Sequence, residues 1–445
     1  MAEPPQSSLA TPVYTAADDP ARAIGAELQR VFAPIAEDRD LSGVVRVERN
    51  GDLIAEGVFG LADAETGRPN QAGTLFDVGS ITKSFTATLV LILEQEGLID
   101  RDAEVSQYLP GLALGQPVTV RQVMEHRAGL PRDVPEEEEA EVTAEGIVSW
   151  VNQQELLFDP GSDEAYSNVG YRLLAELIET VTGEDFPEVL RAKVFLPADL
   201  PDARVAGSAM AAAADVATGY EAGPPPLDLR RPSSARASQG DSGVLLSAAQ
   251  IIDWVEAIDA GRLAQLIPEG EEPIGNVHIR DYDGVSVIQM QGSTPGGGAG
   301  VVYSPADGLS VAYAFNISSY PLWGLERSLF RIGQGETLDN LPSARPQPVA
   351  LEAAHRGLAG RYLHPQFGPI RIEEDEDGMV LEVESLGFRF YLTPIDGGAL
   401  HWRTFNTVLA KPEGSASLTG DMQLIGSPAQ SFELAPAPEE TPAEE

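Results

Sequence analysis

The order of strand-like and helix-like patterns along the chain is the feature that most restricts its fold. Residues 42–63 hold two alternating apolar runs around Asn50-Gly51, a dipeptide suited to a tight turn with positive φ, so we predict a β-hairpin there. Alternating runs return at 285–293, 299–308 and 309–318. Because short turns join these runs, their strands must pair in antiparallel fashion. The pattern therefore predicts an α+β fold: an antiparallel sheet flanked by helices, with a helical subdomain inserted.

The interval between these strand runs is predicted to be helical. Its apolar residues recur at spacings of three and four, and most stretches end at Gly or Pro, which terminate helices. The stretches are a helix beginning near Ser80 and residues 119–130, 145–158, 168–183 and 248–267.

A different pattern follows this first domain, which we predict to span residues 20–338. Residues 339–352 are rich in proline and lack periodicity, as expected of a linker. From 353 to 436, short strand runs alternate with turn residues without helices, which predicts a small all-β barrel. The acidic, proline-rich residues 437–445 are predicted to be a disordered tail.

The charge of the chain limits its partners. It holds 69 Asp and Glu against 29 Lys and Arg, a formal net charge of −40. Such a charge repels nucleic acid and anionic lipid, so we predict neither as a partner. An acidic excess with arginine in place of lysine is typical of halophilic proteins. A highly soluble acidic protein is the alternative.

No metal or cofactor is predicted. The chain has no cysteine, and its histidines show no pair at ligand spacing, so each is interpreted as an ordinary polar residue. No apolar run approaches the ~20 residues of a membrane helix. The first residues lack a signal pattern and are typical of a mature secreted end, so we expect a periplasmic or secreted protein, with a cytoplasmic one as the alternative.

Ser80 and Lys83 are the first candidates for catalysis. Lys83 is one of three lysines in the chain and follows Ser80 by three residues where an apolar helix begins. Free backbone N–H groups at a helix N-terminus favour negative charge on a serine oxygen. The two side chains share a helix face, and burial without a partner disfavours the ammonium form, so Lys83 can accept a proton. The alternative is a serine that caps the helix and a lysine that reaches solvent.

Two further stretches carry candidate residues. Tyr166 and Asn168 lie in a turn before a strong helix. A phenol near a lysine cation can act as a base or proton relay, and an amide can orient a substrate carbonyl and the lysine. The alternative is that Asn168 only caps the helix and Tyr166 only packs. Gly292 and Ser293 lie where a strand ends in small residues, and backbone N–H groups there can bind an oxyanion.

The three motifs together resemble one family. Ser80–Lys83 (SITK), Tyr166–Asn168 (YSN) and Gly292–Gly296 (GSTPG), in this order, resemble the penicillin-recognising serine hydrolases. The likeness is closest to their class C β-lactamase, D-aminopeptidase and esterase branch. It covers roughly residues 25–335 and implies a β-lactamase/transpeptidase-like fold. The last domain is similar, less specifically, to the lipocalin-like barrels appended to some D-aminopeptidase relatives.

The resemblance also implies roles for the candidate residues. Ser80 would be the nucleophile, and Lys83 and Tyr166 would share the proton transfers of acylation and deacylation. Asn168 would position the substrate. The backbone N–H groups of Ser80 and Ser293 would form the oxyanion hole.

One departure from the family pattern concerns the third motif. That motif commonly reads Lys-Thr-Gly or His-x-Gly, and the aligned triplet here is Met290-Gln291-Gly292. Gly292, implied to position the substrate, is kept, but the cationic or imidazole group is absent. We therefore expect inefficient hydrolysis of β-lactams and of peptides with a terminal carboxylate, and favour simple esters.

Other motifs point elsewhere or to weaker roles. Residues 240–243 (GDSG) are similar to the nucleophile loop of trypsin-like proteases, but the chain is helical where that fold is all β, so we predict a loop entering a strand. The glycine-rich residues 296–300 precede a strand, which excludes a nucleotide loop. Arg230, Arg231 and Arg236 are candidates to replace the missing carboxylate anchor, and pairing with nearby acidic residues is the alternative.

The sequence thus predicts a serine hydrolase that forms an acyl-enzyme at Ser80 and acts on small esters or on D-amino-acid amides and peptides. Two alternatives stay open: a β-lactamase, and a weakly catalytic or non-catalytic penicillin-binding-type protein whose barrel is the working part. The expected partner is a small ester, amide or β-lactam substrate. The natural substrate and the oligomeric state are not predicted.

Overall fold

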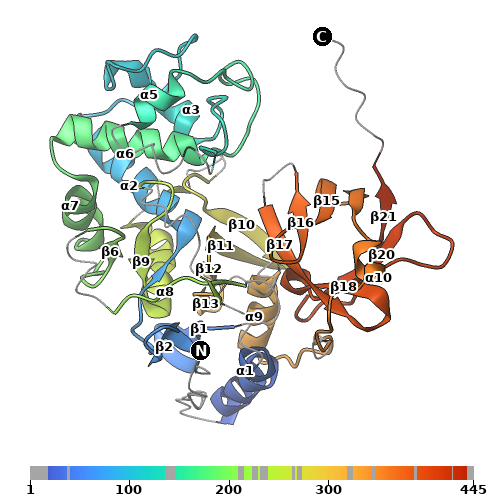
Figure 1. The fold of residues 1–445 in the computed structure, drawn as a ribbon. Helices are drawn as coiled ribbons and strands as arrows, with labels where there is room; N and C mark the ends of the chain where they lie inside the picture. Colours follow the sequence, from blue (N-terminus) through green and yellow to red (C-terminus); the bar gives the residue numbers. More distant parts are fainter. Residues whose placement is uncertain are drawn as a thin grey trace, which may run out of the picture.

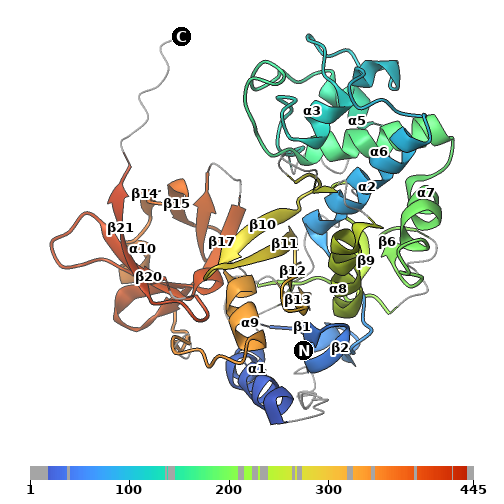
Figure 2. The ribbon, with the colours of Figure 1, turned by 180° about the vertical axis from the view of Figure 1, so that it is seen from behind.

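A six-stranded antiparallel sheet forms the centre of the first domain, in the computed structural model shown in Figures 1 and 2. Its strand order is β10-β11-β12-β13-β1-β2. The strands are β1 (Gly43–Arg49), β2 (Asp52–Phe59), β10 (His278–Tyr282), β11 (Val285–Thr294), β12 (Gly297–Ser304) and β13 (Leu309–Phe315). The structure describes residues 19–37, 41–135, 138, 146–208, 215–222, 229–230, 239–262, 266–267, 273–317, 324–341, 346–384, 388–422 and 424–437.

The hairpin and the returning strands form one sheet, as predicted. Asn50 and Gly51 form the β1–β2 turn with φ of 53° and 80°. Strand β13 pairs antiparallel with β1, from Gly43 opposite Phe315 to Arg49 opposite Leu309. The end of the domain therefore pairs with its beginning, and the antiparallel α+β class is confirmed.

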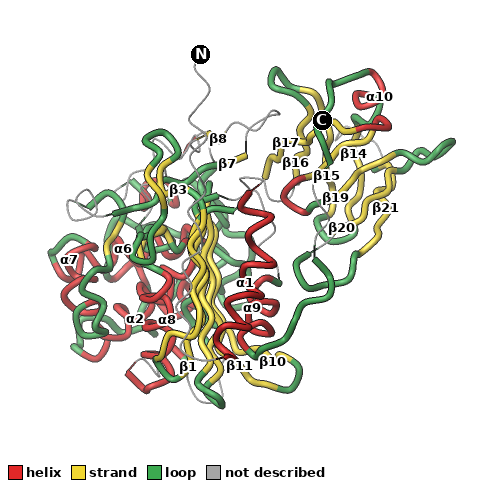
Figure 3. The backbone as a smooth tube through the Cα atoms, turned by 90° about the horizontal axis from the view of Figure 1, so that it is seen from below, coloured by secondary structure: helices red, strands yellow, loops and turns green. Residues whose placement is uncertain are grey.

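Two helix layers cover the sheet, which Figure 3 shows edge-on. Helices α2 (Thr82–Gln95) and α8 (Ala248–Ala257) pack on one face, and α1 (Asp19–Glu37) and α9 (Leu325–Gly333) pack on the other. Each face has its own apolar core, since the side chains of a strand alternate between the two faces. Among the described residues, no helix combines the length and apolar character needed to cross a bilayer.

A helical subdomain extends from the α2 side (Figure 1). It contains α3 (Val120–Met124), α5 (Ile147–Val151), α6 (Asn168–Thr182) and α7 (Phe186–Leu190).

The first domain also has short strands outside the six-stranded sheet. They are β3 (Leu61–Asp63), β4 (Arg68–Pro69), β5 (Phe76–Asp77), β6 (Arg204–Val205), β7 (Glu221–Ala222), β8 (Leu229–Arg230) and β9 (Val244–Leu246). Strand β9 pairs with both β5 and β6, so it links residues just before Ser80 to the middle of the chain.

Three of the predicted helices are shorter than expected. The stretch 119–130 is helical only at α3, because His126 and Gly129 adopt positive φ of 59° and 76°. The stretch 145–158 is helical only at α5, and α8 ends at Ala257, where a π-helical turn, Ile258–Arg262, follows. Helix α1 and strand β10 were not predicted.

The C-terminal domain is a closed antiparallel barrel, as predicted. Its strands are β14 (Gly360–His364), β15 (Gly368–Glu374), β16 (Met379–Val383), β17 (Phe388–Ile395), β18 (Ala399–Trp402), β19 (Thr407–Ala410), β20 (Leu418–Met422) and β21 (Gln430–Pro436), and the short helix α10 (Ala353–Arg356) precedes them. Pairing of β14 with β21 closes the barrel around its own apolar core. The predicted domain boundaries stay a prediction, and the tail beyond Ala437 lies outside the described residues.

The barrel contacts the first domain on the α9 side of the sheet. Ser328 Oγ, on α9, donates a hydrogen bond to the carbonyl of Ile425 at 2.6 Å. The N–H of Gly426 donates to the carbonyl of Asn340 at 2.7 Å, and Ile425 joins the apolar core beneath α9. These contacts attach the loop between β20 and β21 to the sheet face opposite α2.

A buried carboxyl group, Glu326, lies between α9 and the sheet. It is 3% exposed, and its Oε1 accepts a hydrogen bond from Tyr313 at 2.6 Å. Gly300 provides the room, because a Cβ there would lie 2.8 Å from Glu326 Oε1. Burial raises the pKa of Glu326 to about 7, although the hydrogen bond from Tyr313 opposes the shift.

Glu326→Gln is therefore expected to change how stability depends on pH. The folded protein holds the Glu326 proton more tightly than the unfolded chain, so the free energy of unfolding falls as pH rises from about 4.5 to about 7. The variant lacks this pH dependence. Between about pH 4 and pH 8, the free energy of unfolding of the variant should therefore rise by about 3 kcal/mol relative to that of wild type. Denaturant unfolding at both pH values measures the difference, and parallel pH curves would contradict it.

Candidate active site

Ser80 lies in a single 3₁₀ turn, Gly79–Ile81, directly before α2. Gly79 has φ of 53°, and its N–H donates a hydrogen bond to Asp77 Oδ1 at 2.9 Å. Asp77 Oδ1 also accepts from the N–H of Gly243 at 3.2 Å, and burial raises the Asp77 pKa to about 6. Helix α2 has Ile81 at its N-cap, without a side-chain cap. Ser80 is therefore not a helix cap, and that alternative is wrong.

Lys83 is fully buried, so the alternative in which its amine reaches solvent is also wrong. Its Nζ donates hydrogen bonds to three oxygens: Ser80 Oγ at 3.1 Å, Asn168 Oδ1 at 2.7 Å and the Asp241 carbonyl at 2.9 Å. Asp241 belongs to the GDSG stretch, which forms the predicted loop into a strand, β9. No sequence pattern indicated that this loop belongs to the site, but the carbonyl of Asp241 fixes the Lys83 amine.

Tyr166 and Asn168 meet Ser80 and Lys83 in space, although more than 80 residues separate them in the chain. The Tyr166 hydroxyl lies 2.6 Å from Ser80 Oγ, and either oxygen can donate. Asn168 bridges Lys83 to a carboxylate, because its Nδ2 donates to Asp133 Oδ1 at 2.6 Å. The cap of α6 is Ser167, whose Oγ accepts from the N–H of Gly170. The interpretation of Asn168 as only a helix cap is therefore wrong.

Two residues of the loop that follows α3 hold this turn in place. The N–H of Asn168 donates to the carbonyl of Arg132 at 2.7 Å, and the N–H of Ala165 donates to the carbonyl of His126 at 2.9 Å. The His126 ring lies 4.6 Å from the Tyr166 ring, and its Nδ1 accepts from the N–H of Ser167 at 3.1 Å. Burial, aided by the positive charges of Lys83 and Arg132, lowers the His126 pKa to about 3. His126 is therefore a neutral imidazole that packs against Tyr166, a role that was not predicted.

Strand β11 meets the Ser80 turn backbone to backbone. A Cβ at Gly292 would overlap the carbonyl oxygen of Val78 and lie 2.6 Å from the backbone nitrogen of Ser80. A Cβ at Gly79 would lie 2.7 Å from the backbone nitrogen of Ser293. Only glycine fits at both contacts, so the predicted oxyanion donors, the amides of Ser80 and Ser293, belong to backbone segments in direct contact.

Met290 occupies the position of the missing cation. Its side chain is fully buried in the α2-side core, which also contains Val78 and Ile81.

Asn276, which was not predicted, joins β11 to the Ser80 turn. Its Nδ2 donates to the carbonyl of Gln291 at 2.6 Å and to that of Ser80 at 3.3 Å. Asn276 has a φ of 63°, beside Gly275 at 72°. No pattern around Asn276 indicated that its side chain would reach the carbonyl groups of Ser80 and Gln291.

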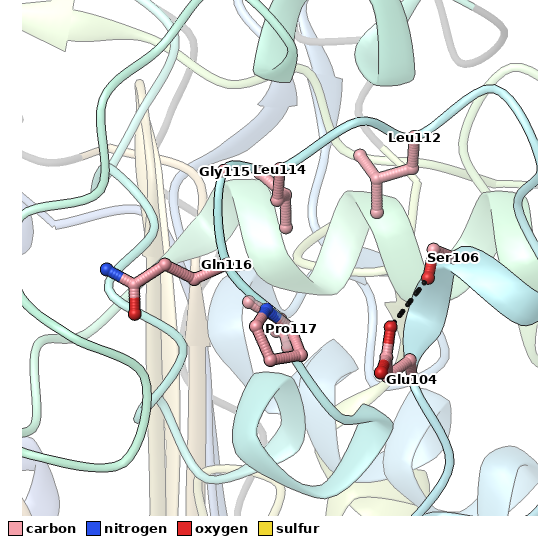
Figure 4. Close-up of a pocket in the computed structure, with 8 residues that line it drawn as sticks. Glu104, Ser106, Leu112, Leu114, Gly115, Gln116 and Pro117 are labelled. Atoms are coloured by element: carbon pink, nitrogen blue, oxygen red, sulfur yellow. Dashed lines mark hydrogen bonds between the residues drawn. The ribbon is translucent and has the colours of Figure 1, made fainter.

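A separate pocket of about 380 Å³ lies in the helical subdomain (Figure 4). Residues of 104–118 line it, and Ser106 Oγ donates a hydrogen bond to Glu104 Oε2 at 3.2 Å. None of the predicted site residues is part of its lining.

Over the described ranges, no cluster of three or more His, Cys, Asp or Glu side chains has the arrangement of a metal site. Arg231 and Arg236, and the side chain of Arg230, lie outside the described residues.

The geometry defines a class of protein. A serine hydroxyl contacted by a phenol and a buried amine, beside backbone N–H groups from a second element, is the arrangement of active-site serine hydrolases. The sequence profile of the Beta-lactamase family matches residues 28–324. The chain therefore belongs to this family of serine hydrolases.

The relatives agree with this assignment. Penicillin-binding protein 4* of Bacillus subtilis is 31% identical over 185 residues, which cover 40% of this chain and 41% of the relative. A D-aminopeptidase of Cereibacter sphaeroides is 26% identical over 369 residues, 77% of this chain and 67% of the relative. A crystal structure of a class C β-lactamase from Rhodobacter sphaeroides superposes with a TM-score of 0.57 at 22% identity, covering 70% of this chain and 98% of that one.

The match to the first curated relatives is partial. The aligned region spans about two fifths of the length of those relatives. The solved structure shares the fold, but its sequence identity is too low to assign its substrate to this protein.

Proposed function

We propose that this protein hydrolyses small esters or D-amino-acid amides and peptides through an acyl-enzyme on Ser80. The observation that carries the proposal is the pair of contacts on Ser80 Oγ, from the Tyr166 hydroxyl at 2.6 Å and from Lys83 Nζ at 3.1 Å. A serine hydroxyl needs a base to become a nucleophile, so in this proposal the Tyr166–Lys83 pair lacks one proton before acylation and receives the proton of Ser80.

Acylation follows from this arrangement. Ser80 Oγ attacks the substrate carbonyl and its proton passes to the Tyr166–Lys83 pair, while the backbone N–H groups of Ser80 and Ser293 hold the oxyanion. Collapse of the tetrahedral intermediate breaks the bond to the leaving group, which takes the proton through Tyr166. Asn168 fixes the Lys83 amine, since Lys83 Nζ donates to its Oδ1 at 2.7 Å.

Deacylation uses the same groups in reverse. A water molecule loses a proton to the Tyr166–Lys83 pair and attacks the acyl carbonyl, and Ser80 Oγ regains the proton as the acid leaves. Asp133 supports this exchange indirectly, because its carboxylate holds Asn168 and through it Lys83.

Two observations support esters and amides as the substrate class: the name of one relative, and Met290 at the position where the family commonly has a cation. The Cereibacter relative is named a D-aminopeptidase, and the alignment extends over most of this chain. Met290 supplies no charge where the family commonly has a cation, so neutral esters and amides suit this position better than carboxylates.

We propose that the barrel supports the fold and is not a lid, since its contacts with α9 lie on the sheet face away from Ser80. Export from the cytoplasm stays a prediction.

The test is rapid mixing with 4-nitrophenyl butyrate at low and at molar KCl. We expect a burst of nitrophenol that matches the enzyme concentration, followed by steady turnover. Acid quenching during turnover should trap a butyryl group, and peptide mass spectrometry should locate it on Ser80. A butyryl group on another residue, or turnover with no trapped acyl group, would contradict the proposal.

A further inference from the structure

We propose that Arg132 is a specificity-determining residue that binds an anionic group on the leaving-group side of the substrate. This inference rests on the proposed function. The family's usual cationic position is Met290, which is buried and uncharged. Arg132 supplies a positive charge to the same site from a different element, the loop that follows α3.

The position of Arg132 puts its charge beside the reacting groups. Its guanidinium carbon lies 5.0 Å from the centre of the Tyr166 ring, and the Tyr166 hydroxyl contacts Ser80 Oγ. The Arg132 carbonyl accepts from the N–H of Asn168, so the arginine backbone is tied to the site by a hydrogen bond of 2.7 Å. Its side chain is 48% exposed and so is accessible to a substrate.

The existing partner of Arg132 does not prevent substrate binding. Arg132 Nε lies 3.2 Å from Asp133 Oδ2, an ion pair at the surface, and such pairs are weak. The other carboxylate oxygen of Asp133 accepts from Asn168. Asp133 therefore serves to orient both side chains, and the guanidinium keeps enough donors to bind a second anion.

The leaving-group side follows from the role proposed for Tyr166. In the proposed mechanism Tyr166 donates a proton to the leaving group, so that group lies next to the Tyr166 hydroxyl. The Arg132 guanidinium lies over the ring of the same tyrosine. A carboxylate on the leaving group would then approach a cation. On a chain with a net charge of −40, such a local cation would offset the repulsion of an anionic substrate.

A pair of esters isolates this interaction. 3-(Butyryloxy)benzoate and 3-(butyryloxy)benzamide form the same butyryl-enzyme and differ only in the charge of the leaving group, so the ratio of their kcat/KM values reports recognition during acylation. At one fixed ionic strength, Arg132→Gln should lower the ratio of benzoate to benzamide about tenfold, and Arg132→Lys should restore part of it. The matched control is Arg327→Gln. Arg327 also lies over a tyrosine ring, 5.8 Å from Tyr282, and pairs with Asp283, but it is on α9.

The outcomes separate the inference from the proposed function. An equal loss of kcat/KM for both esters would leave the ratio unchanged and would mean that Arg132 acts through Tyr166. Wild-type kcat/KM values for both esters would mean that Arg132 binds no anion. Either result overturns the inference while Ser80-dependent turnover persists. If Ser80→Ala hydrolyses both esters at the wild-type rate, the proposed function itself is wrong.

Discussion

Ser80→Ala is expected to lower kcat for 4-nitrophenyl butyrate by about 10⁴-fold or more while the protein stays folded. Removal of a nucleophile from a group of residues that act together typically costs this much. Ser80 is a partly buried residue and does not cap α2, so the loss of its hydroxyl removes little from the fold. Steady-state kinetics measure the change, and unfolding by denaturant checks that the variant is folded.

Ser106→Ala is the matched control for this experiment. Ser106 is an exposed serine that lines the pocket of the helical subdomain, so its variant should retain wild-type turnover. If Ser106→Ala lost activity and Ser80→Ala kept it, the reaction would occur in that pocket and the assignment of the site would be wrong.

Gly292→Ala is expected to lower kcat by about 10²–10³-fold and the free energy of unfolding by about 1–3 kcal/mol. The new methyl group would meet the carbonyl of Val78 and the backbone nitrogen of Ser80, which are backbone atoms that no side-chain rotation can relieve. Strand β11 must then move away from the Ser80 turn. That movement separates the two N–H groups proposed to hold the oxyanion, and the loss of one such donor costs about 3 kcal/mol of transition-state stabilisation.

Gly73→Ala controls for the effect of adding a methyl group to a glycine. A Cβ at Gly73 meets nothing within 4 Å, so this variant should keep both activity and stability. Wild-type kinetics for Gly292→Ala would show that the amides of Ser80 and Ser293 do not act together. A loss of stability without a loss of kcat would show that the close contact serves only the fold.

The two alternative functions make different predictions for the same protein. A penicillin-binding-type protein would acquire the butyryl group once and release it too slowly for steady turnover. A β-lactamase would protect a sensitive host against a β-lactam antibiotic. Met290 bears on both, because a buried thioether supplies neither a cation for the β-lactam carboxylate nor a polar partner for Tyr166.

Local patterns were sufficient for the elements that depend on neighbours in the chain. The Asn50-Gly51 turn, the strands around it and the helix at Ser80 follow from periodicity and turn chemistry, which act over a few residues. The close contact of Gly292 with the Ser80 turn agrees with the expectation that small residues at the end of this strand mark an approach of backbones. The shortened helices show the limit, because the positive φ at His126 that ends the 119–130 pattern is a tertiary feature.

The missed residues share one property: each of them contacts a residue that lies far from it in the sequence. Asp241 contributes a backbone carbonyl to Lys83, and Asn276 joins two carbonyl groups from a loop with positive φ. His126 was interpreted as an ordinary polar residue because nothing near it in sequence indicates that Tyr166 will pack against it. Asp133 is next to Arg132 in the chain, yet its link to Lys83 passes through Asn168, the first residue of α6.

The sequence by itself determined the α+β class, the barrel and the identity of the chemical groups, because periodicity and residue type are local properties. Only the tertiary structure decided that Lys83 is buried with three acceptors, that Tyr166 meets Ser80, and that β11 lies against the Ser80 turn. The physical reason is that these contacts join segments brought together by the pairing of β13 with β1 and by packing around α2. Such contacts depend on the closing of the whole domain, which no short stretch of sequence encodes.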